Sequence, residues 1–208
     1  MPPTSIQPPR LTHLLYLHGF RSSPQSAKAQ LTRRWFGIRH PEVVLECPQL
    51  PPSPHAAAQC MQAIVNNWPQ QTMAVMGSSL GGYYASWVAA QCRCPSVLLN
   101  PAVDPARDLA AHIGENTVWH DPAEAFYFKP EYMDELRALD SRETPAAAPQ
   151  LAIIAKGDEV LDWREMSQRY RDAQQIVLEG GDHALSADYE RLLPQIGAFL
   201  VSLGTVAA

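Results

Sequence analysis

Apolar positions along this chain come in short, nearly unbroken runs that end at Gly or Pro and alternate with longer segments of mixed polarity. Short apolar runs bounded by such residues are typical of buried strands. We predict strands at residues 13–18, 42–47, 72–76, 96–100, 150–155 and 175–179. We predict that the segments between them form helices at residues 24–36, 54–68, 80–91, 162–171 and 187–203.

Regular alternation of buried strands and helices predicts an α/β fold, with a parallel sheet of about six strands and helices on both faces. The crossover connections are then right-handed. In such sheets the functional site lies beyond the carboxyl ends of the strands. The loops expected on that edge begin at Gly19, Pro48, Gly77, Pro101, Gly157 and Gly180.

One segment breaks this rhythm. Residues 104–149, between the fourth and fifth strands, are rich in aromatic residues, proline and charge, and contain one predicted helix near residues 131–139. A chain of 208 residues has the length of one domain. We therefore predict a single domain over residues 1–208 with an insertion at about 104–149.

Composition and charge exclude several classes of protein. The formal charge is −5 and Lys and Arg are not clustered, which argues against a nucleic-acid surface. No apolar run has the roughly 18 residues that a membrane span needs, and the sequence MPPTSIQPPR lacks the apolar stretch of a secretory signal. The four cysteines lack zinc-site spacing, so we expect reduced thiols, a cytoplasmic location and no metal or cofactor.

The stretch VMGSSLGGYY raises the first chemical question, because its serines follow a predicted strand and precede a predicted helix. The pattern G-x-S-x-G fits only when Ser79 is central, with Gly77 and Gly81 on either side. This pattern forms a sharp turn that holds the central serine in a strained conformation at a helix N-terminus. Ser79 is thus a candidate nucleophile and Ser78 a turn residue. The alternative is that Ser79 is an ordinary helix cap.

A nucleophilic serine needs a base, and three histidines fall on the expected edge of the sheet outside the irregular segment: His18, His55 and His183. His183 follows the last strand in EGGDHAL and satisfies the chain order of nucleophile, acid and base. We predict that it is the base, the alternative being a solvent-exposed loop histidine. His18 is expected to brace the loop after the first strand through hydrogen bonds.

An imidazole base needs a carboxylate that fixes its tautomer. The segment KGDEVLDW, after the fifth strand, offers Asp158, Glu159 and Asp162. Asp162 has a competing role as helix N-cap, because Glu165 follows it at capping-box spacing. Asp158 is nearest the end of the strand, so we favour it over Asp162, and Glu159 comes third.

The negative charge that develops on a carbonyl oxygen during acyl transfer needs hydrogen-bond donors. The backbone N–H after the nucleophile, that of Leu80, is one candidate. The loop after the first strand should supply the other, from Phe20, with Gly19 permitting the bend.

Together the segments LHGF, GSSLGGYY, LNPAV, GDEVLD and EGGDHA resemble those of the α/β-hydrolases, and more closely those of the small bacterial YqiA-like esterases. The similarity runs from about residue 14 to about residue 200. The stretches YLHGFRSSPQSAKA, PQLPP and VMGSSLGGYYA are the most similar. The resemblance implies a compact α/β-hydrolase in which Ser79 is the nucleophile, Asp158 the acid and His183 the base.

The same resemblance implies a carboxylesterase for short- or medium-chain acyl esters, with acyl-CoA thioesters as an alternative. Residues 104–149 lie where this superfamily commonly inserts a cap, and they are the part least similar to the family. Arg21 and Lys28 are candidates to contact an anionic substrate group, or are solvated surface charges. A small-peptide hydrolase with the same triad and a non-catalytic binding protein stay open as alternatives. The candidate acyl-pocket residues, which otherwise bury the underside of the segment, are Val118, Trp119, Phe126, Tyr127, Phe128, Tyr132, Met133 and Leu136.

Overall fold

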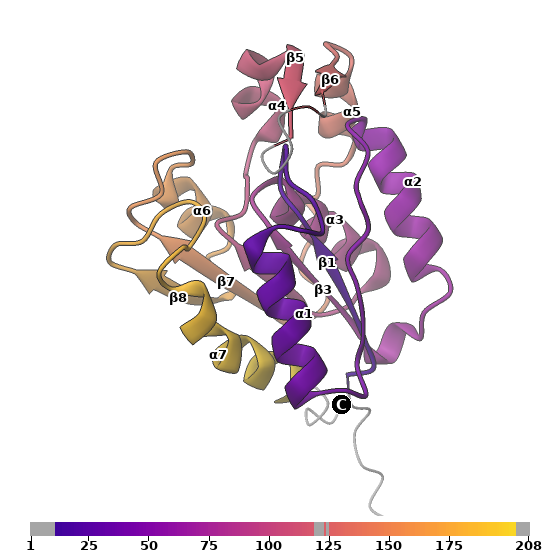
Figure 1. Cartoon of the computed structure of the whole chain (residues 1–208), viewed down its shortest axis with the longest axis vertical. Coiled ribbons are helices and arrows are strands. Elements are labelled where there is room, and N and C mark those ends of the chain that lie inside the picture. Colours follow the sequence, from indigo (N-terminus) through magenta and orange to yellow (C-terminus); the bar gives the residue numbers. More distant parts are fainter. Residues whose placement is uncertain (1–10, 119–122, 124, 203–208) are drawn as a thin grey trace, which may run out of the picture.

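The computed structural model describes residues 11–118, 123 and 125–202, and a six-stranded parallel sheet forms its centre (Figure 1). The strand order is β2-β1-β3-β4-β7-β8. Every neighbouring pair in this sheet is parallel, as the alternation of strands and helices predicts. The strands are β1 (His13–Leu17), β2 (Val44–Glu46), β3 (Met73–Ser78), β4 (Ser96–Leu99), β7 (Gln150–Ala155) and β8 (Gln174–Leu178).

Helices cover both faces of the sheet. The α-helices are α1 (Ala27–Arg39), α2 (Pro54–Val65), α3 (Leu80–Cys92), α4 (Pro105–Asp108), α5 (Tyr132–Ala138), α6 (Trp163–Arg169) and α7 (Tyr189–Ser202), with short 3-10 helices at Gln70–Thr72 and Ala110–His112. Helices α1 and α7 lie side by side on one face (Figure 1). Helices α2, α3 and α6 pack on the opposite face. No described helix is long and apolar enough to cross a lipid bilayer.

Alternate residues of the four central strands, β1, β3, β4 and β7, build two separate hydrophobic cores. Leu14 and Tyr16 of β1 pack in the core under α1 and α7. Leu15 and Leu17 of the same strand pack in the core under α2 and α3. Each of these four side chains is almost completely buried. A strand buried on both faces has no polar positions to alternate, which explains its continuous apolar pattern.

The six predicted strands and six predicted helices are all present, with ends that differ by a few residues. Helix α1 begins three residues later than predicted, because Ser26 caps it by accepting a hydrogen bond from the N–H of Ala29. Two antiparallel strands in the irregular segment, β5 (Gly114–Thr117) and β6 (Ala125–Phe128), are not foreseen by the sequence. The run GENT in β5 has neither apolar alternation nor β-branched enrichment, so it carries no strand pattern.

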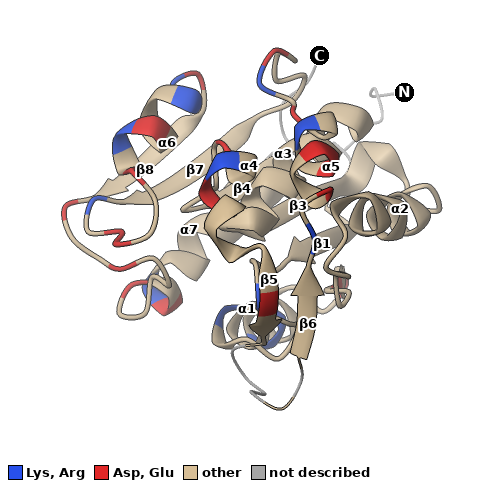
Figure 2. Cartoon of the chain, turned by 90° about the horizontal axis from the view of Figure 1, so that it is seen from above, with Lys and Arg blue, Asp and Glu red and all other residues tan. Residues whose placement is uncertain are grey.

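The segment between β4 and β7 is anchored to the main body by polar contacts. The carboxylate of Glu135 accepts hydrogen bonds from Ser53 Oγ (2.7 Å) and from the N–H of His55 (2.9 Å), at the start of α2. The Tyr83 hydroxyl of α3 donates to the Leu136 carbonyl (2.6 Å). Seen from above, acidic and basic residues are interspersed along α4, α5 and α6 (Figure 2). The segment is therefore fixed at its helical end.

Candidate active site

Ser79 occupies the sharp turn between β3 and α3, in a backbone conformation that non-glycine residues rarely adopt (φ 57°, ψ −122°). A Cβ atom at Gly77 would lie 2.0 Å from the Gly81 carbonyl oxygen, and one at Gly81 would lie 2.0 Å from that of Leu17. Glycine is therefore required on both sides of the serine. The Ser79 side chain makes no capping hydrogen bond to α3, which removes the alternative of an ordinary helix cap.

The two serines of the turn differ in surroundings. Ser78 ends β3 and is only 4% exposed. Both serines border a cavity of about 730 Å³, but Ser79 is the more exposed of the two, and a Cβ atom at Gly19 would lie 3.7 Å from its hydroxyl oxygen. The backbone of the turn after β1 thus passes close to the Ser79 hydroxyl, as a second hydrogen-bond donor to a developing oxyanion requires.

His183 and Asp158 are joined by a hydrogen bond of 2.8 Å between Nδ1 and Oδ2. The Asp158 side chain is completely buried, and its other oxygen accepts from the N–H groups of Val160 and Leu161, both at 2.8 Å. An ionised carboxylate at Oδ2 selects the tautomer in which Nδ1 carries the proton. The Nε2 atom is then left as an acceptor, which is the state that a general base needs.

His183 lines the same cavity as Ser79. In the part of the chain that the structure describes, no hydrogen bond joins the Ser79 hydroxyl to the imidazole. Catalytic hydrogen bonds are often long before substrate binds and tighten in the complex. The cavity brings a strained serine and a carboxylate-bound histidine together, as the sequence motifs predict.

Two backbone N–H groups at this cavity are available to an oxyanion. The N–H groups of Phe20 and Leu80 have no acceptor among the described residues, although both residues line the cavity. Leu80 begins α3, where the helix leaves its first N–H groups unpaired. Leu80 directly follows Ser79, and Phe20 directly follows Gly19, whose backbone lies close to the Ser79 side chain.

His18 is buried, and both of its ring nitrogens are engaged. Its Nε2 accepts from the N–H of Leu50 at 3.0 Å, so Nδ1 carries the proton and donates to the Gly19 carbonyl at 3.0 Å. This neutral imidazole joins the loop after β1 to the loop after β2. The geometry is that of a brace rather than a base.

The remaining acidic residues of KGDEVLDW have other roles. Asp162 caps α6 by accepting from the N–H of Arg164 at 2.8 Å. Glu159 accepts from the backbone N–H of His183 at 3.0 Å. The predicted capping box is wrong at Glu165, whose carboxylate pairs with Arg107 at 2.9 and 2.7 Å instead of returning to the cap.

The prediction that aromatic and apolar residues of the inserted segment line the acyl pocket is wrong for the described residues. Trp119 lies outside the described residues, and none of the other seven lines the cavity that contains Ser79. Phe128 is buried and packs against Phe20 and Tyr132, with ring centroids 4.9 and 5.3 Å apart. Phe128 and Tyr132 bury the underside of the segment between β4 and β7, because a short segment needs an apolar patch to pack against the main body. The segment contributes other residues to the cavity: Pro105, Asp108, Leu109 and His112.

Arg21 and Lys28 both line the cavity, and each is partly buried. Arg21 Nε donates to the Thr117 carbonyl at 2.6 Å. Lys28 Nζ donates to the Ala184 carbonyl at 2.9 Å. Burial lowers the pKa of Lys28 to about 8, because the charged form loses hydration there.

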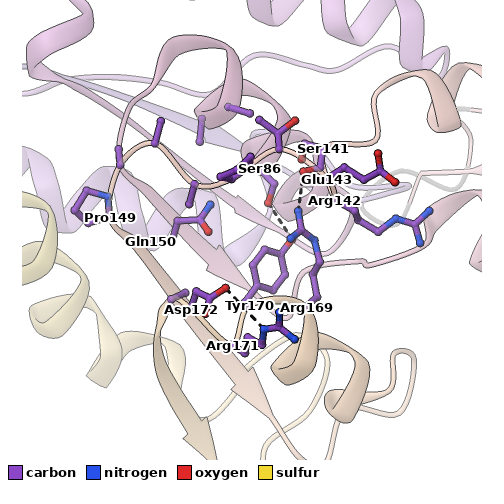
Figure 3. Close-up of a pocket in the computed structure, with 18 of the residues that line it drawn as sticks. Ser86, Ser141, Arg142, Glu143, Pro149, Gln150, Arg169, Tyr170, Arg171 and Asp172 are labelled. Carbon is purple, nitrogen blue, oxygen red and sulfur yellow. Dashed lines mark hydrogen bonds and ion pairs between the residues drawn. The ribbon is translucent and has the colours of Figure 1, made fainter.

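A second cavity, of about 670 Å³, lies between α3, residues 141–150 and residues 168–173 (Figure 3). Its lining reaches Gln150, the first residue of β7, so it is at the amino end of the sheet and away from Ser79. The hydroxyl groups of Ser86 and Tyr170 are hydrogen-bonded to each other there at 2.9 Å. Among the described residues that line it there is no histidine that could activate a serine.

Sequence patterns did not single out Asn100, which is fully buried at the end of β4. Its side chain bonds the backbone of the loop that carries His183. The available signal was a polar residue directly after an apolar strand, on the edge where the functional loops meet.

The chain matches one family model, described as an uncharacterised protein family (UPF0227), over residues 13–201. Among solved structures it is similar to Est1E from Butyrivibrio proteoclasticus with ferulic acid bound (TM-score 0.77, 13% identity, 99% of this chain and 94% of that chain). It is also similar to mouse alpha/beta hydrolase domain-containing protein 10 (0.74, 15%, 96% and 97%) and to an esterase domain from Rhodothermus marinus (0.68, 19%, 95% and 88%). At these identities the likeness establishes the fold.

Proposed function

The chain belongs to the UPF0227 family and has the α/β-hydrolase fold, and from the geometry of its site we propose that it is a serine carboxylesterase for short- to medium-chain acyl esters. The observation that carries this proposal is the hydrogen bond between His183 and the buried Asp158, at the cavity that Ser79 lines. A serine on a strained turn, a base with a fixed tautomer and two unpaired N–H groups are the components of acyl transfer.

In the first half of the reaction, Ser79 Oγ attacks the ester carbonyl carbon while His183 Nε2 takes the hydroxyl proton. The carbonyl oxygen becomes an oxyanion, which accepts hydrogen bonds from the N–H groups of Phe20 and Leu80. The imidazolium is stabilised by Asp158. Collapse of the tetrahedral intermediate breaks the bond to the leaving oxygen, and His183 returns the proton to the departing alcohol.

The second half repeats these steps with water. His183 takes a proton from water as the water oxygen attacks the acyl carbon bound to Ser79. The same two N–H groups hold the new oxyanion. The bond between the acyl carbon and Ser79 Oγ then breaks, and Oγ takes the proton from His183, so that the free acid leaves and the serine is regenerated. Asp158 stays ionised throughout.

The cavity also supports an acyl substrate. Leu31, Leu109, Val160 and Leu161 give it apolar walls, and Val160 is 63% exposed beside the loop of His183. An apolar acyl chain gains free energy by leaving water for such walls, at about 0.8 kcal/mol for each buried CH₂. Two fold relatives support the same class of reaction: the esterase domain from Rhodothermus marinus, and Est1E, whose solved structure has ferulic acid bound. A cytoplasmic location and a single domain whose 104–149 segment acts as a cap complete the proposal.

Labelling with a fluorophosphonate tests this function directly. The reagent should bond to Ser79 of the intact chain, as located by mass spectrometry of its peptides, and p-nitrophenyl esters of increasing acyl length should be hydrolysed. Failure of both labelling and hydrolysis would favour a binding protein on a hydrolase scaffold. Comparison of kcat/KM on esters, acyl-CoA thioesters and amides then sets the substrate class.

A further inference from the structure

We infer that Asn100 is a positioning residue for the base His183, an inference that rests on the proposed function and adds to it a residue outside the triad. Asn100 follows β4, is completely buried and has a positive φ of 39°. Asparagine is one of the few residues that tolerate this region of backbone conformation. Both its burial and its backbone conformation fit a residue whose side chain makes specific hydrogen bonds inside the protein.

The Asn100 side chain joins the centre of the sheet to the loop after β8. Its Oδ1 accepts from the N–H of Ala155, at the end of β7, at 2.8 Å. Its Nδ2 donates to two successive carbonyls of that loop, those of Asp182 (3.1 Å) and His183 (3.2 Å). Its backbone N–H donates to the Ile153 carbonyl of β7 at 2.9 Å. The backbone of the base is thereby tied to two central strands.

The three hydrogen-bonding partners at this position match the side chain of asparagine and no shorter or charged replacement. A primary amide has one oxygen that accepts and one nitrogen with two N–H groups that donate, and this site uses all of these functions. Aspartate has the same shape but presents a second oxygen to two carbonyl oxygens, so it repels both. Glycine keeps the backbone conformation and removes all three hydrogen bonds.

Other contacts to this loop are closer to solvent. Glu159, which accepts from the N–H of His183, is exposed, and Lys28 donates to the Ala184 carbonyl at a distance of 2.9 Å. Asn100 has no exposed surface and holds the backbone of the loop, whereas Asp158, whose side chain is equally buried, bonds the imidazole ring itself. A buried hydrogen bond is costly to break because its partners cannot turn to water. Asn100 therefore holds the backbone of the His183 loop rigidly, and the position of the imidazole relative to Asp158 and Ser79 depends on these bonds.

The test compares Asn100→Gly and Asn100→Asp with the parent protein, using ester hydrolysis and proton NMR. We expect kcat to fall about 10- to 100-fold with little change in KM, since small displacements of a catalytic group cost this much. We also expect loss of the protected Nδ1 proton signal of His183, which requires the hydrogen bond to Asp158. Ser86→Ala is the matched control, because it removes buried hydrogen bonds at the second cavity and should change neither readout.

A parent-like kcat and an intact Nδ1 signal in folded Asn100→Gly would overturn the inference. If Asn100→Gly does not fold, the near-isosteric Asn100→Asp is read by the same criteria. The NMR signal does not depend on turnover. Absence of labelling and hydrolysis in the parent protein would therefore refute the proposed function, while the Nδ1 signal would still decide whether Asn100 positions His183.

Discussion

Arg21 is bonded to Thr117, so that the turn after β1 is fixed to strand β5 of the segment between β4 and β7. Arg21 Nε donates to the Thr117 carbonyl at 2.6 Å and a terminal nitrogen donates to the Thr117 hydroxyl at 3.2 Å. The preceding residue, Phe20, packs its ring on Phe126 and Phe128 at centroid distances of 5.9 and 4.9 Å. The proposed oxyanion donor at Phe20 is therefore held by the inserted segment.

The first prediction separates the two serines. Ser79→Ala should lower kcat for a short p-nitrophenyl ester by about 10³-fold or more, because the covalent route is lost and only oxyanion and binding contributions remain. Ser78→Ala should retain most of the activity, since Ser78 is buried at the end of β3. Near-normal turnover by purified, folded Ser79→Ala would show that the nucleophile is elsewhere.

The second prediction assigns the acid. Asp158→Asn should lower kcat by about 10⁴-fold, because an amide at this position favours the wrong imidazole tautomer while leaving the shape intact. Asp162→Asn is the control, since Asp162 caps α6 and Asn also accepts a capping hydrogen bond. Steady-state kinetics decide between them. Equal losses in the two variants would contradict the assignment to Asp158.

The positions of Ser79, His183 and Asp158 could be predicted from the sequence, because each depends on a short local motif or on the end of a strand. The strained turn needs Gly77 and Gly81 within two residues of Ser79, so the whole requirement lies in one short motif. His183 and Asp158 follow strand ends, and the parallel topology brings such ends to one edge. The same reasoning singled out Phe20 and Leu80 as proposed oxyanion donors, because a backbone N–H depends on its position in the fold rather than on side-chain type.

The walls of the cavity could not be predicted in this way. Phe126 and Phe128 are residues of the type that lines acyl pockets. Their rings instead pack against Phe20, because the inserted segment must bury apolar surface to dock on the main body. The β5–β6 pairing depends on a partner strand and not on a local pattern. The contacts of Asn100 join residues about 82 positions apart, a separation that no periodicity records.

The third prediction concerns the turn that carries Phe20. Arg21→Gly should lower kcat about 10-fold, because the turn loses its bonds to Thr117 and its N–H donor moves relative to the oxyanion. Glycine is chosen because Arg21 has a positive φ of 59°, so the substitution adds no backbone strain. Arg137→Gly, at an exposed residue of α5, controls for the lost charge. Unchanged kcat in Arg21→Gly would show that the turn is held without β5.

The last prediction follows from Lys28, whose pKa burial lowers from 10.5 to about 8. In the folded protein the charged form is disfavoured, so between pH 8 and 10.5 the unfolded chain binds more protons than the native chain. The free energy of unfolding must therefore rise with pH across this window, and below it the full penalty of the buried charge remains. Replacement by an uncharged side chain of similar length removes that penalty.

Lys28→Met should accordingly be more stable than the parent protein at pH 7, by about 1–2 kcal/mol once the lost hydrogen bond to Ala184 is subtracted. Because only the parent gains stability as Lys28 deprotonates, this difference should shrink as the pH rises from 8 to 10. Urea unfolding of both proteins at several pH values measures it. Lys129→Met removes one charge at an exposed site and serves as the control. A stability difference that stays constant over this range would show that the Lys28 ammonium is hydrated in the folded protein.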